Sequence, residues 1–500
     1  MTRHPDEQYR PRFHFTPPQQ WMNDPNGMVY YEGEYHLFYQ HYPDSNVWGP
    51  MHWGHAVSTD LLHWEHLPVA LFPDSLGYIF SGSAVVDQQN TSGLGTTEQP
   101  PLVAIFTYHD PQGEKDGRKT FQTQGIAYST DRGRTWTKYQ GNPVLPNPGI
   151  RDFRDPKVFW HPPSQRWVMA LAVADHIRFY TSSDLLSWAY ASSFGQGAGA
   201  HGGVWECPDL FPLPVAESGE ERWVLLVSIN PGGPNGGSAT QYFVGDFDGQ
   251  QFSLDTAFAE ALHTDGARWV DYGRDNYAGV TWAGIPPEDG RRIFIGWMSN
   301  WDYANVVPTY QWRSAMTLPR YLSLQQTTQG LRLSSAPVQE TAKLRQAPVS
   351  LPDELTDGTV LHRSNQELLV EVLLTVELPE SYQGSFGLSL TNDQGNRYRA
   401  GYDAATKTYF SDRTESGQTA FSEAFAKKLH RAPATTPTDA VTLHLFVDVA
   451  SAELFAEAGT IALTDIFFPD SPFTHLQFFQ QGDPLSIIEA DVYVLQALTE

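Results

Sequence analysis

Three short segments of the chain repeat one pattern, and this repeat constrains the fold more than any other feature. Ser58–Trp64, Ser129–Trp136 and Ser182–Trp188 each begin with Ser, carry Asp at the third position and end in Trp. Each follows a short apolar run, as a hairpin between the outer strands of a sheet would. Because units of about 64 residues would divide the first 320 residues or so into five, the repeat predicts a five-bladed β-propeller.

The rest of the pattern is also that of an all-β protein. Short apolar runs such as Tyr35–Tyr39 and Trp167–Leu171 are bounded by Gly, Pro, Asn and Asp, the residues that end strands. Longer alternating runs follow later, as in Glu367–Glu377, and predict a β-sandwich. We therefore predict an all-β fold with a five-bladed propeller over residues 1–323, a connecting segment rich in Gln, Ser, Thr and Ala over 324–349, and a β-sandwich over 350–500.

Composition excludes several classes of protein. With 32 basic and 57 acidic residues the net charge is −25, so a basic face for nucleic acid is not expected. No apolar run reaches the roughly 18 residues of a membrane span, and we expect no membrane partner. The single cysteine, Cys207, excludes a disulfide framework and a Cys-rich zinc site.

The first ten residues lack the apolar stretch of a secretory signal. The chain as written is therefore expected in the cytoplasm, and it would be secreted if a leader has been removed. The sequence leaves open a homo-oligomer.

Three segments place a carboxylate shortly before a proline and an apolar run: Asp24 in Trp21–Gly27, Asp155 in Phe153–Phe159 and Glu206 in Trp205–Phe211. Each segment alone is equally typical of a turn. Their spacings of 131 and 51 residues correspond to about two repeat units and one. Since the first strand of each propeller blade lines the central axis, the three carboxylates are expected to meet at one mouth of the channel.

Two more segments are candidates for inner strands of the remaining blades. They are Phe80–Val86 and Asp271–Val280.

Three carboxylates that converge repel one another, so the predicted meeting of Asp24, Asp155 and Glu206 needs a functional reason.

The motifs W-M-N-D-P-N-G, F-R-D-P and W-E-C-P-D resemble the signatures of glycoside hydrolase family 32, the family of invertases, levanases and exo-inulinases. Leu443–Asp448 followed by Ser451–Phe455 resembles the signature of its sandwich domain, although Ala450 stands where serine is usual. The resemblance spans the chain and implies a five-bladed propeller followed by a β-sandwich.

The resemblance also implies a mechanism, hydrolysis of β-fructofuranosides with retention of configuration. Such chemistry uses two carboxyl groups roughly 5–5.5 Å apart. By resemblance Asp24 is the nucleophile, Glu206 the general acid/base and Asp155 the stabiliser of the transition state. The implied substrates are sucrose and fructo-oligosaccharides, with levan and inulin as candidate polymers, and no cofactor is required.

Residues that bind the sugar are implied by the same motifs. Those matching the fructose subsite are Asn23, Gln40, Trp48 and Ser81. Arg154 is expected to orient Asp155 or to contact the sugar. Weaker candidates are Trp53, Phe80, Asp271, Trp297 and Trp301.

Other readings remain at this stage. A fructosyltransferase would use the same site, and a non-catalytic fructan-binding protein would have the same fold. We expect no metal site, because the pairs His52/His55 and His63/His66 lie in aromatic surroundings without a clear acidic partner. Gly197–Gly202 fits G-x-G-x-x-G but does not lead into a helix, so we expect no dinucleotide.

Overall fold

The computed structural model describes residues 7–352, 354–435 and 439–498. Nearly all regular structure in these residues is β, as predicted. The α-helices are α1 (Pro111–Lys115) and α2 (Thr256–Asp265), and the 3-10 turns include η2 (Ala304–Val306), η3 (Gln339–Leu344) and η4 (Glu457–Gly459). None of the described helices is both long and apolar enough to cross a bilayer.

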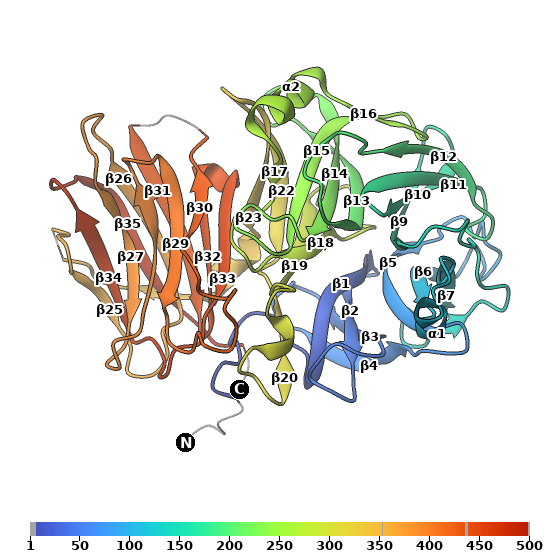
Figure 1. The fold of residues 1–500 in the computed structure, drawn as a ribbon, viewed down its shortest axis with the longest axis horizontal. Coiled ribbons are helices and arrows are strands. Elements are labelled where there is room, and N and C mark those ends of the chain that lie inside the picture. Colours follow the sequence, from blue (N-terminus) through green and yellow to red (C-terminus); the bar gives the residue numbers. More distant parts are fainter. Residues whose placement is uncertain (1–6, 353, 436–438, 499–500) are drawn as a thin grey trace.

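Five antiparallel sheets form the first body of the molecule, at the right in Figure 1. The first contains β1 (Gln20–Tyr31), β2 (Glu34–Tyr42), β3 (His52–Ser58) and β4 (Glu65–Leu71), with β20 (Trp312–Arg313) added in parallel to β1. The second contains β5 (Tyr78–Val86), β6 (Leu102–His109), β7 (Gln122–Ser129) and β8 (Thr137–Lys138). The third contains β9 (Phe153–His161), β10 (Arg166–Val173), β11 (His176–Ser182) and β12 (Ala189–Phe194).

The fourth and fifth sheets complete this body. The fourth contains β13 (Val204–Pro214), β14 (Glu221–Asn230), β15 (Ala239–Phe247) and β16 (Phe252–Leu254), with β17 (Arg268–Trp269) paired to β15. The fifth contains β18 (Tyr277–Thr281), β19 (Arg292–Met298), β22 (Arg320–Thr327) and β23 (Gly330–Pro337), with β21 (Ala315–Met316) paired to β19. The first strands of the five sheets contact one another in the closed order β1, β5, β9, β13, β18 and back to β1. The five sheets therefore form a ring, and these five strands are its inner strands.

The repeated Ser-x-Asp…Trp segments are turns between the third and fourth strands of the first three sheets, as predicted. In the first of them the Ser58 hydroxyl accepts from the Leu61 amide at 2.8 Å, and the Asp60 carboxylate accepts from the His63 amide at 2.8 Å. The Trp64 indole donates back to the Leu61 carbonyl at 3.2 Å. Corresponding bonds recur in the other two segments. The repeat thus encodes one tight turn that is closed by a hydrogen bond from the tryptophan indole.

The predicted connecting segment differs from the structure in its first half. The strands β22 and β23 form a continuous hairpin register from Arg320↔Pro337 to Thr327↔Gly330, and β22 pairs with β19. Residues 324–337 are therefore part of the fifth sheet. Their Gln- and Ser-rich composition misled the prediction because β22 alternates buried and exposed residues, and its exposed positions carry the polar side chains.

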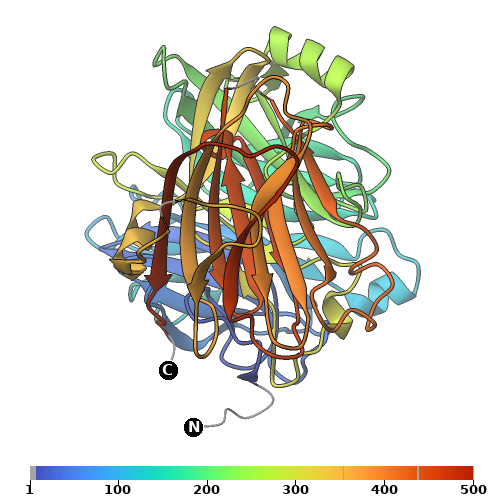
Figure 2. The same cartoon turned by 90° about the vertical axis from the view of Figure 1, so that its left-hand side faces the viewer.

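Two six-stranded sheets form the second body, at the left in Figure 1 and toward the viewer in Figure 2. One contains, in order, β24 (Arg345–Pro348), β35 (Ile487–Leu495), β26 (Val370–Glu377), β31 (Ala440–Asp448), β32 (Ser451–Ala456) and β33 (Ile461–Ile466). The other contains β25 (Val360–Arg363), β34 (His475–Gln481), β27 (Ser385–Thr391), β28 (Arg397–Asp403), β29 (Thr408–Glu415) and β30 (His430–Pro433). Side chains of both sheets share one apolar core, as the alternation of the sequence predicts.

Buried charged residues join the two bodies. The His14 imidazole lies 2.7 Å from the Asp448 carboxylate and 2.8 Å from that of Glu453. Arg320, at the start of β22, bonds Glu453 and lies 2.9 Å from the Asp271 carboxylate. All five side chains are buried. We call these residues, His14, Asp271, Arg320, Asp448 and Glu453, the interface cluster.

Candidate active site

Each inner strand of the ring breaks its regular pairing near the same end. The irregular stretches are Met22–Pro25, Ile79–Gly82, Arg154–Lys157, Glu206–Asp209 and Tyr277–Val280. A β-bulge at such a point turns a side chain away from the alternation of the strand. Three residues here, Asp155, Cys207 and Ala278, have positive φ angles of 61°, 45° and 53°. Strained backbone is thus present at the bulges where the predicted carboxylates lie.

The structure brings Asp24, Asp155 and Glu206 together, from three different sheets. Cys207 connects the first two: its amide donates to Asp155 Oδ2 at 3.3 Å and its thiol to Asp24 Oδ2 at 3.5 Å. Arg154 connects the other pair, with its guanidinium 2.8 Å from the Glu206 carboxylate and 3.6 Å from that of Asp155. The convergence predicted from the spacing is therefore present. We call the three residues the catalytic carboxylates, after the role that the sequence predicts for them.

Asp24 is held by two hydrogen bonds in a buried position. Ser81 Oγ donates to its Oδ2 at 2.6 Å, and Asn23 Nδ2 donates to its Oδ1 at 3.0 Å. The Trp21 indole fixes Asn23 in turn, donating to its amide oxygen at 2.7 Å. Burial and the charge of Glu206 raise the pKa of Asp24 even though the hydrogen bond from Ser81 opposes this. Its carboxylate is oriented but poorly solvated.

The Asp155 carboxylate is repelled by two neighbouring carboxylates, those of Glu206 and Asp24. Burial raises the pKa of Asp155 to about 8; Arg154 opposes this, and the charges of Glu206 and Asp24 add to it. Arg154 is shared, because it also bonds the Asp152 carboxylate at 2.8 Å. One guanidinium thus serves several carboxylates, and the group as a whole carries uncompensated negative charge.

Glu206 has two donors. Arg154 bonds its Oε1, and the Tyr277 hydroxyl donates to its Oε2. Burial and the neighbouring Glu206 carboxylate raise the pKa of Tyr277 well above the ordinary value, so the phenol stays protonated and remains a donor. Sequence reasoning missed Tyr277, although it lies within Asp271–Val280, the segment predicted as the fifth inner strand.

Cys207 is buried among the three carboxylates. Burial and their negative charges raise the pKa of its thiol. A thiol that resists ionisation is a poor nucleophile. Cys207 therefore acts as a packed neighbour of Glu206 and not as a nucleophile.

The remaining predicted sugar contacts fall into two groups, and the first lies around the catalytic carboxylates. Gln40 is buried and donates to the carbonyl of Ile79, next to Phe80 and Ser81. Trp48 is 40% exposed, and its ring lies 6.1 Å from that of Phe80. Phe80 stacks on His109 at 4.2 Å. Aromatic surface is thus presented beside the Ser81 bulge.

Two predicted contacts lie elsewhere and are corrected. Asp271 belongs to the interface cluster, where Arg320 and the amide and hydroxyl of Thr464 occupy its oxygens. Trp297 has no exposed surface and packs between Trp21 and Trp301, which is the more accessible of the three. Both follow a motif-like pattern in the sequence, but burial removes them from contact with a ligand. The described residues contain no group of three or more His, Cys, Asp and Glu side chains arranged to hold a metal ion.

Two family models match the chain from end to end. The model "Glycosyl hydrolases family 32 N-terminal domain" matches residues 14–337, and "Glycosyl hydrolases family 32 C terminal" matches residues 336–494. The chain belongs to glycoside hydrolase family 32. It is a glycoside hydrolase, as the motifs predicted.

Relatives within family 32 cover nearly the whole chain. A levanase of Bacillus subtilis (strain 168) is 48% identical over 98% of this chain and 71% of its own length. An extracellular exo-inulinase of Aspergillus awamori is 39% identical over 98% of this chain and 95% of its own.

Solved structures of relatives have the same fold as this chain. The crystal structure of the Aspergillus awamori exo-inulinase has a TM-score of 0.89 at 37% identity, covering 98% of this chain and 99% of the other. A fructofuranosidase from Schwanniomyces occidentalis complexed with fructosylnystose has a TM-score of 0.83 at 31% identity, covering 99% of each chain.

Proposed function

We propose that this family 32 hydrolase is a retaining, exo-acting β-fructofuranosidase. It releases terminal non-reducing fructose from sucrose and fructo-oligosaccharides, and from levan or inulin. The observation that carries the proposal is the convergence of Asp24, Asp155 and Glu206 at bulges of three inner strands. The names of the relatives, levanase and exo-inulinase, support both the substrate class and the exo mode.

The proposal includes an architecture. The five sheets are the blades of a five-bladed β-propeller around the inner strands, and the two six-stranded sheets are a β-sandwich. We place the boundary after residue 337, at the end of β23, since the fifth sheet includes that strand. The connection then runs from residue 338 to 344 and includes η3, and the sandwich begins with β24.

In the first step Asp24 attacks the anomeric carbon of the terminal fructose. The hydrogen bonds from Ser81 and Asn23 aim its carboxylate, and burial keeps water away from the attacking oxygen. The bond between the anomeric carbon and the leaving oxygen breaks while the bond to Asp24 forms. The product is a covalent fructosyl-enzyme.

Glu206 donates its proton to the leaving oxygen in that step. In the second step it takes a proton from water, which attacks the anomeric carbon and releases Asp24. The enzyme returns to its starting state. Arg154 and Tyr277 fix the Glu206 carboxyl at both oxygens, so the same group can serve in both steps from one position.

Asp155 is proposed to bind hydroxyl groups of the fructose. Hydrogen bonds to its carboxylate strengthen as positive charge develops on the ring, and this stabilises the transition state. Gln40, Trp48 and Phe80 complete the fructose subsite. The two aromatic rings pack on apolar faces of the sugar, and the Gln40 side chain, whose amide nitrogen donates to the carbonyl of Ile79, accepts from a sugar hydroxyl at its amide oxygen.

A substrate panel tests the proposal. The enzyme is incubated with sucrose, levan and inulin, and products are sized at a few per cent conversion. Free fructose as the first product from a fructan, and equal glucose and fructose from sucrose, are the expected results. Glucose in excess over fructose would identify a fructosyltransferase, early di- to tetrasaccharides an endo-enzyme, and no product a binding protein.

The role of Glu206 has its own test. Glu206→Gln is expected to lose activity on sucrose, and to lose less in the first step with an activated aryl fructoside. Azide should restore turnover of the activated substrate, because it attacks the fructosyl-enzyme without base assistance. Equal losses on both substrates without rescue would overturn the assignment.

Secretion is the location we propose, because the Aspergillus relative is extracellular.

A further inference from the structure

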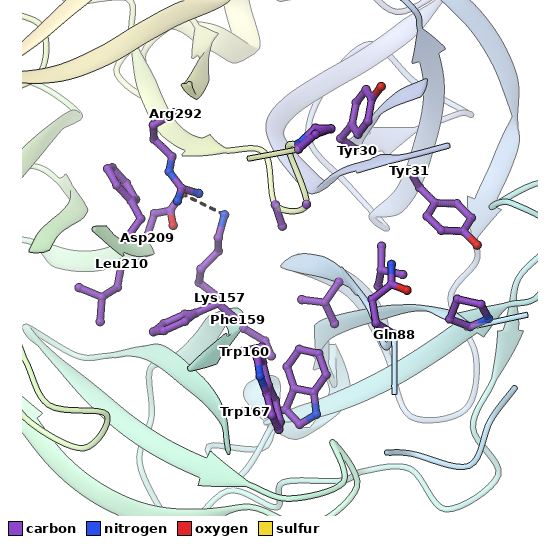
Figure 3. A pocket seen from close by; sticks show the side chains of 18 of the residues that line it. Tyr30, Tyr31, Gln88, Lys157, Phe159, Trp160, Trp167, Asp209, Leu210 and Arg292 are labelled. Atoms are coloured by element: carbon purple, nitrogen blue, oxygen red, sulfur yellow. Dashed lines mark hydrogen bonds and ion pairs between the residues drawn. The ribbon is translucent and has the colours of Figure 1, made fainter. Parts of the chain in front are cut away.

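A second hollow lies at the other end of the inner strands from the catalytic carboxylates. It has a volume of about 810 Å³ and is lined by residues from all five sheets of the ring, among them Tyr31, Gln88, Lys157, Trp160, Asp209 and Arg292 (Figure 3). We call it the basal pocket. On β1 it begins at Tyr30, six residues beyond Asp24, which corresponds to roughly 20 Å of strand. On β9 and β13 it begins nearer, at Lys157 and Asp209, two and three residues beyond Asp155 and Glu206, but none of the residues proposed for the fructose subsite lines it.

One wall of the basal pocket has polar groups with unused hydrogen-bonding capacity. The Lys157 ammonium lies 3.0 Å from Asp209 Oδ2 and 2.7 Å from the carbonyl of Thr281. The other oxygen of Asp209, Oδ1, is buried and has no partner within the described part of the chain. Arg292 carries five N–H donors, and among the described residues its guanidinium makes one long hydrogen bond, 3.5 Å to the carbonyl of Trp282.

A ligand that both donates and accepts hydrogen bonds would satisfy the polar groups of this wall. A buried acceptor without a donor costs about 1–3 kcal/mol, and a ligand that satisfies it recovers part of this. A hydroxyl group can donate to Asp209 and accept from Arg292 at the same time. Several hydroxyls on one ligand would fit better than a single one, because the Gln88 amide also lines the pocket.

Another wall is aromatic. Figure 3 shows Trp160 and Trp167 on a different side of the hollow from the Lys157, Asp209 and Arg292 group. The rings of the two tryptophans meet edge-to-face at 5.1 Å, and Trp160 is only half-buried. The apolar faces of a sugar ring pack on indole in this way. Polyhydroxylated and apolar surface together are what a saccharide offers.

The charge of the pocket argues against an anion. Lys157 and Asp209 neutralise each other. Two exposed carboxylates also line the pocket: Glu32 is paired with Arg132, and Glu98 offsets the charge of Arg292. The whole chain carries −25. Pockets of roughly 300–1,000 Å³ hold ligands of drug size, which includes a short oligosaccharide.

We propose that the basal pocket binds a neutral oligosaccharide, as a second, non-catalytic sugar site at the far end of the inner strands. The choice of a fructosyl oligosaccharide as its occupant rests on the proposed function; the pocket chemistry does not. A polymer that binds there would stay near the enzyme between cleavage events, which lowers its apparent KM.

The test follows each site with its own reporter. Methyl-labelled enzyme carrying Asp24→Asn, which blocks turnover, is titrated with the trisaccharide 1-kestose. Leu210 lines the basal pocket, and Ile79 adjoins the fructose subsite through its carbonyl, which accepts from Gln40. Two separate saturating curves are expected. Gln88→Ala, at an exposed position, and Trp160→Ala should weaken the Leu210 curve at least tenfold and leave the Ile79 curve unchanged.

The control variant is Tyr190→Ala, an exposed aromatic residue on β12 outside the pocket, which should change neither curve. No saturating Leu210 shift up to 50-fold the concentration that saturates Ile79 overturns the proposal, and so does a Leu210 curve that the pocket variants leave intact. Inorganic phosphate binding at Leu210 more tightly than 1-kestose would overturn the assignment to a neutral sugar. Failure of the proposed function looks different: wild-type enzyme would release no fructose from 1-kestose, and the Ile79 curve would be lost.

Discussion

The three carboxylates of the interface cluster and the three catalytic carboxylates, of which only Glu206 is partly exposed, are compensated differently. In the interface cluster Asp271, Asp448 and Glu453 contact two cations, His14 and Arg320. Of the three catalytic carboxylates, Asp155 and Glu206 share one cation, Arg154, with a fourth acid, Asp152. Asp24 is hydrogen-bonded by the neutral side chains of Ser81, Asn23 and Cys207. The residue types are alike, and the number of counter-charges differs.

The pKa shifts of the two groups run in opposite directions. Burial alone would raise every carboxyl pKa, but His14 lowers the pKa of Asp448, and Arg320 with His14 lowers that of Glu453. Asp24 and Asp155 instead keep raised pKa values. A cluster of carboxylates whose charge is compensated stabilises the fold. An undercompensated cluster destabilises the fold, and such clusters with raised pKa values are typical of functional sites.

The largest expected effect concerns catalysis. Asp24→Asn removes the attacking anion but keeps its shape, so we expect kcat to fall by about 10⁴-fold, which corresponds to about 5.4 kcal/mol of barrier. The measurement is the initial rate on sucrose. Asp271→Asn in the interface cluster is the matched control and should leave kcat of the folded enzyme within threefold of wild type. A variant of Asp24 that keeps a tenth of the activity would contradict the assignment.

The next effect concerns stability. Arg320→Met leaves Glu453 and Asp271 buried without their cation, and breaking such a pair costs about 3–5 kcal/mol. Urea unfolding followed by fluorescence should show it. Arg397→Met is the control, because Arg397 pairs with Glu415 at the surface and such pairs contribute about 1 kcal/mol or less. Equal losses in both variants would remove the distinction between buried and surface pairs.

The third prediction concerns alkaline pH. Burial lowers the pKa of His14, but hydrogen bonds to Asp448 and Glu453 outweigh it and raise the pKa to about 9 from 6.5. A raised histidine pKa stabilises the fold fully below pH 6.5, and this contribution is lost as the pH rises through about 9. We expect unfolding free energy to fall by about 2 kcal/mol over that range, and His14→Gln to flatten the curve. A wild-type curve that is level between pH 6.5 and 9 would speak against a charged His14.

The smallest expected effect has the opposite sign. Because the pKa of Asp155 is raised, its ionisation destabilises the folded state as the pH rises from the unfolded value of 3.8. Asp155→Asn should therefore be more stable than wild type at pH 7, by about 1 kcal/mol or more, since one pKa unit corresponds to about 1.4 kcal/mol. The difference should shrink toward pH 4 while activity stays low. Lower stability at pH 7 would mean that Arg154 compensates Asp155 fully.

The sequence predicted those features that local residue types determine. The Ser-x-Asp…Trp turns depend on hydrogen bonds within seven or eight residues, and they are where the repeat placed them. The convergence of Asp24, Asp155 and Glu206 followed from the repeat spacing, because equivalent positions of equivalent sheets face one axis. These parts of the fold and site needed no long-range information.

Features that depend on distant partners were not predictable in the same way. Asp271 resembles a site residue, yet its oxygens are bound by Arg320 and Thr464, the latter 193 residues away. The polar composition of 324–337 concealed strands whose partners lie in β19 and in each other. Tyr277 reaches Glu206 across 71 residues, through a bulge that leaves no mark in the sequence.

The parallel pairing of β20 with β1 can form only late in the synthesis of the chain. Gln20 and Trp21 pair with Trp312 and Arg313, so the first sheet lacks this edge until 292 more residues have been translated. At about 5–20 residues per second this takes roughly 15–60 s, during which the first sheet is incomplete on the ribosome. The segment around His14 waits longer still, for Asp448. The beginning of this chain is thus among the last parts to reach its final contacts, and it is the part that a nascent-chain chaperone would have to protect.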